Sequence, residues 1–365
     1  LQVTFSILIV LQTFFSPFQG YLVDKFGPRL LLSIGTILTG LSWVLSANLT
    51  TVSNLYITYG VLGGLGTGIV YIGVVGLMVR WFPNNRGFAV GMVAAGYGIG
   101  ALLTTFPIAT SLTETGLQGT LTFFGYIIGA VGLLAAQGIR VPHADRIQTA
   151  GQIEAAASGV APKAMLKTPV FWLMFLMMSM MSTSGLMVIS QMGAFAKDFG
   201  ITGAMVFGMA ALPLALTIDR VTNGLTRPLF GWVSDKIGRE YTMTIAFGLE
   251  AVAMFFWVMT RSDPVMFVIL SGIVFFGWGE IFSLFPSTLT DTFGQKHATT
   301  NYGFLYMAQG VGSIIGGPIA AYIHGVTESW IPVFAIMIAL DATAALLAFF
   351  VLRPMRAKYL KNKAA

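Results

Sequence analysis

Long apolar runs separated by short polar connections make up most of this sequence. Eleven runs approach the length that a membrane-spanning helix needs, about 20 predominantly apolar residues. They lie at approximately 1–20, 30–49, 54–79, 87–112, 118–139, 170–195, 204–232, 241–260, 264–286, 301–323 and 330–352. The pattern predicts an all-α integral membrane protein that crosses the lipid bilayer several times.

The composition supports a membrane protein and narrows its chemistry. Hydrophobic residues make up 56% of the chain and charged residues 9%, whereas soluble domains carry about 25% charged residues. The chain has no cysteine, which excludes disulfides and thiol chemistry. Its three scattered histidines form no metal-ligand cluster, and no phosphate-binding loop is present. We therefore expect no metal, no cofactor and no enzymatic activity.

Positive charge predicts the orientation of the chain. Lysines and arginines fall on alternate connections and on the C-terminal tail, so the positive-inside rule places 141–167 and the C-terminus in the cytoplasm. The net charge of +6 is thus a topology signal, and no nucleic-acid partner is expected. We expect a monomer in the cell membrane, the inner membrane in a bacterium.

The two halves of the chain repeat each other. The segment 17–27 corresponds to 228–238, and both contain Gly-x-x-x-Asp-Lys-x-Gly. This repeat predicts an N-terminal bundle at 1–140, a polar linker at 141–167 and a C-terminal bundle at 168–365. The second half has six spans and the first five, so we expect one further span ahead of this chain. A natural eleven-span protein with an external N-terminus is the alternative.

Arg227 is an expensive residue for its position, because arginine within a bilayer costs at least about 2.5 kcal/mol. It lies eight residues from Asp235, a rise of roughly 12 Å that places it near the midplane. Its planar guanidinium suits a carboxylate. Asn223 and Asp219 lie one and two turns away. Arg220 shares its face by spacing and lies further out, as a cavity-entrance guide or an ion-pair partner. An interhelical structural network is the alternative for Asp219 and Arg220, and also for Arg227.

Other polar and aromatic residues are expected at a similar depth. Tyr71 and Tyr97 offer phenol donors, and apolar walls are predicted from Trp278, Phe282 and Tyr306, with Gln309 at the same level. Packing or lipid-facing roles remain open for each aromatic residue. Glu280 lies two residues after Trp278, so it is expected to point about 200° away from Trp278 on the helix.

The paired halves with their Asp-Lys turns resemble the major facilitator superfamily over essentially the whole chain. The resemblance implies two six-helix bundles and a cytoplasmic gating role for five turn residues: Asp24, Lys25, Asp235, Lys236 and Arg239. From the residues themselves, each aspartate can accept hydrogen bonds from a neighbouring helix N-terminus. In this fold Glu250 and Asp341 belong to helices at the periphery.

A narrower resemblance joins 81–98 and Asn223-x-x-x-Arg227-Pro228 to the monocarboxylate transporters and the bacterial oxalate–formate antiporters. It implies that Arg227 binds substrate. Monocarboxylate transporters typically carry Asp where this chain has Asn223, which leaves the site of proton handling open. The antiporters carry a second cation, a lysine, where this chain has neutral Gln309, so a single carboxylate is the expected ligand.

The sequence therefore predicts a secondary transporter that moves a small monocarboxylate, such as L-lactate or pyruvate, with a proton by alternating access. Organic anion exchange of the oxalate–formate type is the alternative within this class. A transporter-like membrane sensor is the alternative from another class.

Overall fold

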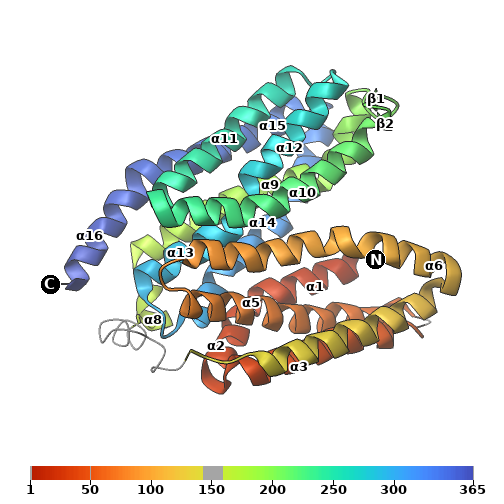
Figure 1. Ribbon diagram of the computed structural model, residues 1–365. Helices are drawn as coiled ribbons and strands as arrows, with labels where there is room; N and C mark the ends of the chain where they lie inside the picture. Colours follow the sequence, from red (N-terminus) through yellow and green to blue (C-terminus); the bar gives the residue numbers. More distant parts are fainter. Residues whose placement is uncertain (1, 50, 143–158, 365) are drawn as a thin grey trace. The chain divides into compact units, whose positions relative to one another are not determined.

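The computed structural model describes residues 2–49, 51–142 and 159–364, which are mostly helical (Figure 1). The predicted all-α class is confirmed. In chain order the elements are α1 Gln2–Phe14, α2 Ser16–Phe26, α3 Pro28–Ser46, α4 Val52–Leu55, the π-helix η1 Tyr56–Gly63, α5 Gly64–Trp81, α6 Arg86–Gly138, α8 Pro162–Met165, α9 Pro169–Asp198, β1 Met205–Val206, β2 Met209–Ala210, α10 Ala211–Ile237, α11 Arg239–Met259, α12 Pro264–Trp278, α13 Ile281–Phe293, α14 Ala298–Thr327, α15 Ile331–Leu347, the π-helix η3 Ala348–Leu352 and α16 Arg353–Ala364.

The predicted spans coincide with helices, but the count of eleven is not confirmed. Within the described ranges, eight helices are long and apolar enough to cross a membrane, or nine if the bent pair α1 and α2 forms one span. Helix α6 contains two predicted spans, joined at Gly116, whose φ of 70° and ψ of −179° are not helical. Helix α10 is not among the eight, because its charged residues interrupt the apolar sequence.

The predicted span 204–232 is wrong at its beginning. Met205–Val206 and Met209–Ala210 form a two-stranded antiparallel hairpin. Its central residues Phe207 and Gly208 have φ angles of 51° and 77°, and positive φ at both positions is typical of a type I′ hairpin turn. The helix therefore begins only at Ala211.

The sequence repeat has a counterpart in backbone geometry. Gly27 separates α2 from α3 with φ 89° and ψ 153°, and Gly238 separates α10 from α11 with φ 101° and ψ 154°. Side chains disfavour this region of φ, so glycine is required at both turns. The two Asp-Lys segments thus end in the same backbone conformation.

The helices form two compact units, each described by itself. The first contains Leu1–Pro83, Gly100–Thr168 and Leu289–Gly310, and the second Asn84–Ile99, Pro169–Thr288 and Val311–Ala365. In the first unit α3 and α1 pack against α5. In the second, α10 and α11 pack against α12, and α15 packs against α9 and α11. The bundle boundaries expected from the sequence remain a prediction.

The outer face of α11 is apolar, as a helix in contact with lipid requires. Ile245, Val252 and Phe256 are 54%, 54% and 52% exposed, whereas Phe247, Glu250 and Met254 on the same helix are fully buried. A large exposed apolar surface would be a liability in water. In hydrocarbon it is the expected outer surface of a bundle.

Most of the predicted linker, 143–158, lies outside the described residues. Its last part belongs to the first unit and is held in place there. The backbone N–H of Val160 donates to the carbonyl of Phe293 at 2.7 Å, and Asn301 Nδ2 donates to the carbonyl of Val160 at 3.1 Å. This segment is therefore attached to the connection between α13 and α14.

Candidate functional site

Helix α10 has one buried polar face. Asp219, Asn223, Thr226, Arg227 and Ser234 are all buried, at spacings that place them along one side of the helix. Such a stripe on a membrane helix marks a face turned toward protein or a cavity rather than lipid. Arg227 is 6% exposed and lies at the centre of this stripe.

The Arg227 guanidinium is held by neighbouring groups of the second unit. Nη1 donates to the carbonyl of Ala94 on α6 at 2.7 Å, and Nη2 donates to Oδ1 of Asn223 at 2.6 Å. The Phe282 ring lies against it, with its centroid 4.6 Å from Cζ. Both hydrogen bonds go to uncharged oxygens, and together they fix the orientation of the guanidinium.

Glycines of α6 bring its backbone against Arg227. A Cβ at Gly91 would overlap the carbonyl of Arg227, and a Cβ at Gly98 would come within 3.5 Å of its Cζ. The absence of side chains at these positions lets α6 approach α10 closely and leaves space beside the guanidinium. The segment 81–98 was noted in the sequence because it resembles a family motif. In the structure, its glycines allow α6 to pack closely against α10.

Phe282 and Trp278 form an aromatic pair beside this group. Their rings meet edge to face at 5.7 Å, and the Trp278 indole N–H donates to the carbonyl of Met181 on α9 at 2.9 Å. Phe282 thus contacts Arg227, as predicted for an apolar wall, and Trp278 packs against the Phe282 ring. Tyr97 lies on the same segment of α6 as Ala94 and is 53% exposed.

The other predicted binding residues, Tyr71, Tyr306 and Gln309, lie in the first unit. The Tyr71 ring lies 5.1 Å from that of Tyr306 and 6.5 Å from that of Tyr302, whose hydroxyl is 3.4 Å from the Tyr71 hydroxyl. Gln309, one turn after Tyr306 on α14, is 9% exposed. The structure therefore brings Tyr71 and Tyr306 together and adds Tyr302, which the sequence analysis did not single out.

Asp219 and Arg220, although adjacent, have different surroundings. Asp219 is 4% exposed on the buried stripe and lies near Ser271 of α12. Arg220 is exposed, and it makes no ion pair within the part of the chain that the structure describes. The seven-residue spacing between Arg220 and Arg227 therefore does not place them in equally buried positions.

Each Asp-Lys turn is bonded to the start of a helix from the other half of the chain. In the second unit, Asp235 accepts hydrogen bonds from the backbone N–H of Gly87 and of Phe88, at 3.0 and 2.9 Å, and pairs with Arg239 at 2.7 Å. In the first unit, Asp24 accepts from the backbone N–H of Thr300 at 2.9 Å. The predicted hydrogen bonding to helix N-termini is present in both.

The ion pair of Asp24 was missed by sequence reasoning. Arg80, which the sequence analysis did not name, forms an ion pair with Asp24 and also donates to Thr299 Oγ1 at 3.3 Å. The lysines of the two turns are exposed, and Lys25 lies over the Tyr21 and Phe26 rings at 5.6 and 5.2 Å. The Asp-Lys motif therefore does not by itself show whether its lysine is buried in a structural contact or exposed.

The helix assumed around Glu280 is interrupted. Helix α12 ends at Trp278 and α13 begins at Ile281, so Gly279 and Glu280 lie in a break. Gly279 nevertheless keeps helical dihedral angles, φ −62° and ψ −26°, so the expected separation of Trp278 and Glu280 around the helix axis stays a prediction. A Cβ at Gly279 would lie 2.5 Å from the carbonyl oxygen of Asn223, which shows that this break packs directly against α10.

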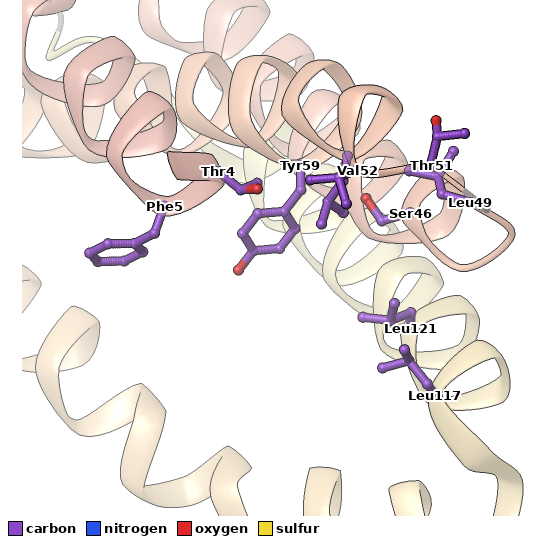
Figure 2. A pocket seen from close by; sticks show the side chains of 10 residues that line it. Thr4, Phe5, Ser46, Leu49, Thr51, Val52, Tyr59, Leu117 and Leu121 are labelled. Atoms are coloured by element: carbon purple, nitrogen blue, oxygen red, sulfur yellow. The ribbon is translucent and has the colours of Figure 1, made fainter. Parts of the chain in front are cut away.

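A separate cavity of about 470 Å3 lies in the first unit (Figure 2). Its lining residues come from the start of α1, the end of α3, from α4 and η1, and from the part of α6 just after Gly116; they include Phe5, Tyr59, Leu117 and Leu121 (Figure 2). None of the ten lining residues is charged. The cavity therefore has apolar character and lacks the cation that an organic anion requires.

Comparison with known proteins identifies the class to which this fold belongs. Residues 1–218 and 213–365 each match the profile of the Major Facilitator Superfamily. The Escherichia coli fucose:proton symporter FucP has a similar structure, with a TM-score of 0.74 over 96% of this chain and 90% of that one at 12% identity. The chain belongs to the Major Facilitator Superfamily, and the predicted fold is confirmed.

Two groups of relatives are similar in sequence. The oxalate:formate antiporter of Oxalobacter formigenes is 34% identical over 355 residues, covering 97% of this chain and 82% of that protein. The monocarboxylate transporter 13 of Bos taurus is 22% identical over 335 residues, covering 91% and 75%. The chain is thus a multi-pass membrane transporter and not an enzyme, and its relatives carry small organic anions.

Proposed function

We propose that this protein carries a small monocarboxylate, such as L-lactate or pyruvate, together with a proton by alternating access. Arg227 is the carboxylate-binding residue of this proposal. Its support is the buried guanidinium on a polar membrane helix, oriented by Ala94 and Asn223 through uncharged oxygens. A planar donor fork of this kind pairs with both oxygens of one carboxylate.

The remaining predicted binding residues belong to the same proposal. Phe282 and Trp278 supply an apolar surface beside Arg227 for the substrate's hydrocarbon part, and Asn223 supplies a polar group. Tyr71, Tyr97, Tyr306 and Gln309 are proposed to contribute uncharged donors and ring surface. The neutral amide of Gln309 supports a ligand with one carboxylate, because a second carboxylate calls for a second cation.

The two turn aspartates are proposed to act as a gate on the cytoplasmic side, with 141–167 and the C-terminus in the cytoplasm. Opening that side requires Asp24 to release the start of α14 and Asp235 to release the start of α6. Each release breaks hydrogen bonds to an ionised carboxylate, worth about 1.5–3 kcal/mol each. Substrate binding energy and the gradient would drive these steps.

Exchange of organic anions of the oxalate–formate type is the second candidate, and the 34% identity to the Oxalobacter formigenes antiporter favours it. The two can be separated in proteoliposomes containing the purified protein. Symport predicts accumulation of labelled L-lactate driven by an inward proton gradient into vesicles without internal substrate. Uptake that occurs only with an internal counter-substrate would instead establish exchange.

A further inference from the structure

Three carboxylic acids are buried together within the second unit. Glu250 lies on α11, Glu280 in the break between α12 and α13, and Asp341 on α15, and each is 0% exposed. Glu250 interacts electrostatically with both Asp341 and Glu280, and Glu280 interacts with Asp341. We call Glu250, Glu280 and Asp341 the acid cluster.

Close packing holds the acid cluster in place. A Cβ at Gly277, just before the helix break, would lie 2.9 Å from Cβ of Glu250, so α12 is in direct contact with α11 at this level. The Ser184 hydroxyl on α9 is fully buried and donates to Asp341 Oδ2 at 3.0 Å. Four helices thus converge on the three carboxyl groups.

The carboxyl groups need a bound cation or proton. Both oxygens of Glu250, both of Glu280 and Oδ1 of Asp341 have no hydrogen-bond partner among the described residues. An ionised carboxylate buried in this way costs several kcal/mol, and neighbouring like charges increase that cost. The described residues contain no group of three acids or histidines arranged to hold a metal ion. A proton, in contrast, needs only one of these carboxylate oxygens as its partner.

Few other charged groups face the acid cluster. On α9 the charged residues are Lys197 and Asp198, 13 and 14 residues beyond Ser184, or roughly 20 Å along the helix. On α11, Arg239 and Glu240 lie at its start, 11 and 10 residues from Glu250.

The other packed helices add little charge. Helix α12 contains no charged residue, and the only charged residue of α15 is Asp341 itself. On α13, Asp291 lies 11 residues after Glu280. Helix α10 contributes Arg227 and Asp219 from its buried face. Of these, Arg227 interacts electrostatically with Glu280.

The helix break connects the acid cluster to Arg227. Gly279 packs against the backbone of Asn223 and the side chain of Thr226 on α10. The Thr226 hydroxyl in turn donates to the carbonyl of Phe276 at 2.5 Å. Gly279 thus contacts the turn of α10 that carries Arg227, and the next residue, Glu280, belongs to the acid cluster.

We propose that Glu250, Glu280 and Asp341 form the proton-binding site of this transporter, and that Glu280 couples it to the anion bound at Arg227. This inference rests on the proposed function and assigns the residues that carry its proton. One proton adds to one carboxylate oxygen of the cluster when the anion binds and leaves from it when the anion is released. One monocarboxylate and one proton together move no net charge.

The coupling has a simple electrostatic origin. The positive charge of Arg227 stabilises the ionised form of Glu280, and an anion bound to Arg227 cancels that stabilisation. Anion binding therefore favours proton binding at Glu280, and by linkage proton binding favours the anion by the same factor. The proton site need not touch the substrate for the two to travel together.

Proton uptake measured alongside L-lactate uptake in proteoliposomes tests this inference. We expect a ratio of about one proton per lactate for the unaltered protein, and for E280Q a ratio lower by about tenfold, within the range of site–site couplings. Labelled lactate exchange should remain measurable in E280Q. The control E114Q makes the same change at an exposed glutamate of α6 and should keep the ratio near one. An unchanged ratio in E280Q would overturn the proposal.

A spectroscopic measurement on the purified protein needs no transport. Infrared difference spectra between acidic and alkaline pH should contain the C=O stretching bands of protonated carboxyl groups. E250Q, E280Q and D341N should each remove part of that signal, and E114Q should leave the buried component. If no variant altered these bands, the acid cluster would not be a proton site. If the bands behaved as expected but neither lactate nor formate were transported, the proposed function would fail and the proton site would stand.

Discussion

Asp24 and Thr300 are joined by two hydrogen bonds to one carboxylate oxygen. The Thr300 backbone N–H donates to Asp24 Oδ2 at 2.9 Å, and its hydroxyl donates to the same oxygen at 2.6 Å. Asp235 has the corresponding relationship with the backbone of Gly87 and Phe88. Since Asp24 and Asp235 occupy equivalent positions of the repeat, each half of the chain supplies an acid to a helix start in the other half.

Weakening the Asp24 contact should open this end of the molecule. D24N removes the charge that strengthens both hydrogen bonds and the Arg80 ion pair, a loss of about 1.5–3 kcal/mol per bond. The population with the gate open should rise at least about tenfold. The chain has no cysteine, so maleimide labelling of T299C, at a residue 1% exposed, reports opening directly.

Asp263 offers a matched control for the gate. It also accepts from backbone N–H groups at a helix start, those of Val265 and Met266, but within its own helix α12. D263N should therefore leave T299C labelling unchanged. Equal labelling of T299C with and without D24N would show that Asp24 does not hold the gate.

Packing of α6 against α10 should be sensitive at Gly91. In G91A the added methyl group would overlap the backbone carbonyl of Arg227 and the Cα of Pro228, which displaces α10 where the guanidinium begins. Overpacking of this kind costs about 1–3 kcal/mol, and we expect lactate uptake to fall about tenfold or more. In G96A the methyl group meets no described atom within 4 Å, so G96A should transport normally. Comparable activity of the two variants would contradict this packing.

Replacing Asn223 by an acid should make anion binding dependent on pH. In N223D the new carboxylate would lie at hydrogen-bond distance from Arg227 Nη2 and compete with the substrate for the guanidinium. We expect the KM for lactate at neutral pH to rise about tenfold, by roughly the 1.4 kcal/mol of a partly buried ion pair, and to recover as the pH falls and the aspartate is protonated. N223L, which cannot ionise, should show no such recovery. A KM for N223D that does not vary with pH would argue against competition at Arg227.

A second cation should broaden the ligand range toward dicarboxylates. Q309K places a lysine at the position where the oxalate–formate antiporters are expected to carry one. We predict that oxalate competes with labelled substrate at least about tenfold better in Q309K than in the unaltered protein, one unit charge being worth roughly 1.4 kcal/mol here. Q309M tests the loss of the amide without added charge. If oxalate already competes strongly with Gln309 in place, the selection for one carboxylate is wrong.

The membrane fold was largely predictable from the sequence, because apolar runs of helical length allow few other structures in a bilayer. The sequence also indicated that Arg227 does not face lipid, because an arginine in contact with hydrocarbon is costly, and Arg227 is buried; its binding role stays a prediction. The repeat also indicated that Asp24 and Asp235 are equivalent. Its glycines Gly27 and Gly238 showed where the turns are.

Features set by tertiary contact were not predictable. No local pattern indicated that Arg80 pairs with Asp24 or that the carbonyl of Ala94 orients Arg227, since these partners are remote in sequence. Trp278 and Glu280 were placed on one continuous helix, and no local pattern indicated that this helix is interrupted at Gly279 and Glu280. The hairpin at Met205–Ala210 was missed because its residues continue the apolar pattern of the helix that follows.

Uptake of labelled L-lactate by proteoliposomes containing R227A or R227K tests the central claim most directly. Loss of the planar guanidinium should abolish saturable uptake in R227A. In R227K, which keeps the charge but not the donor fork, KM should be raised about tenfold or more. Normal folding of both variants is checked by their elution and thermal unfolding in detergent. If R227A took up lactate with unaltered KM and rate, Arg227 would not be the residue that binds the carboxylate.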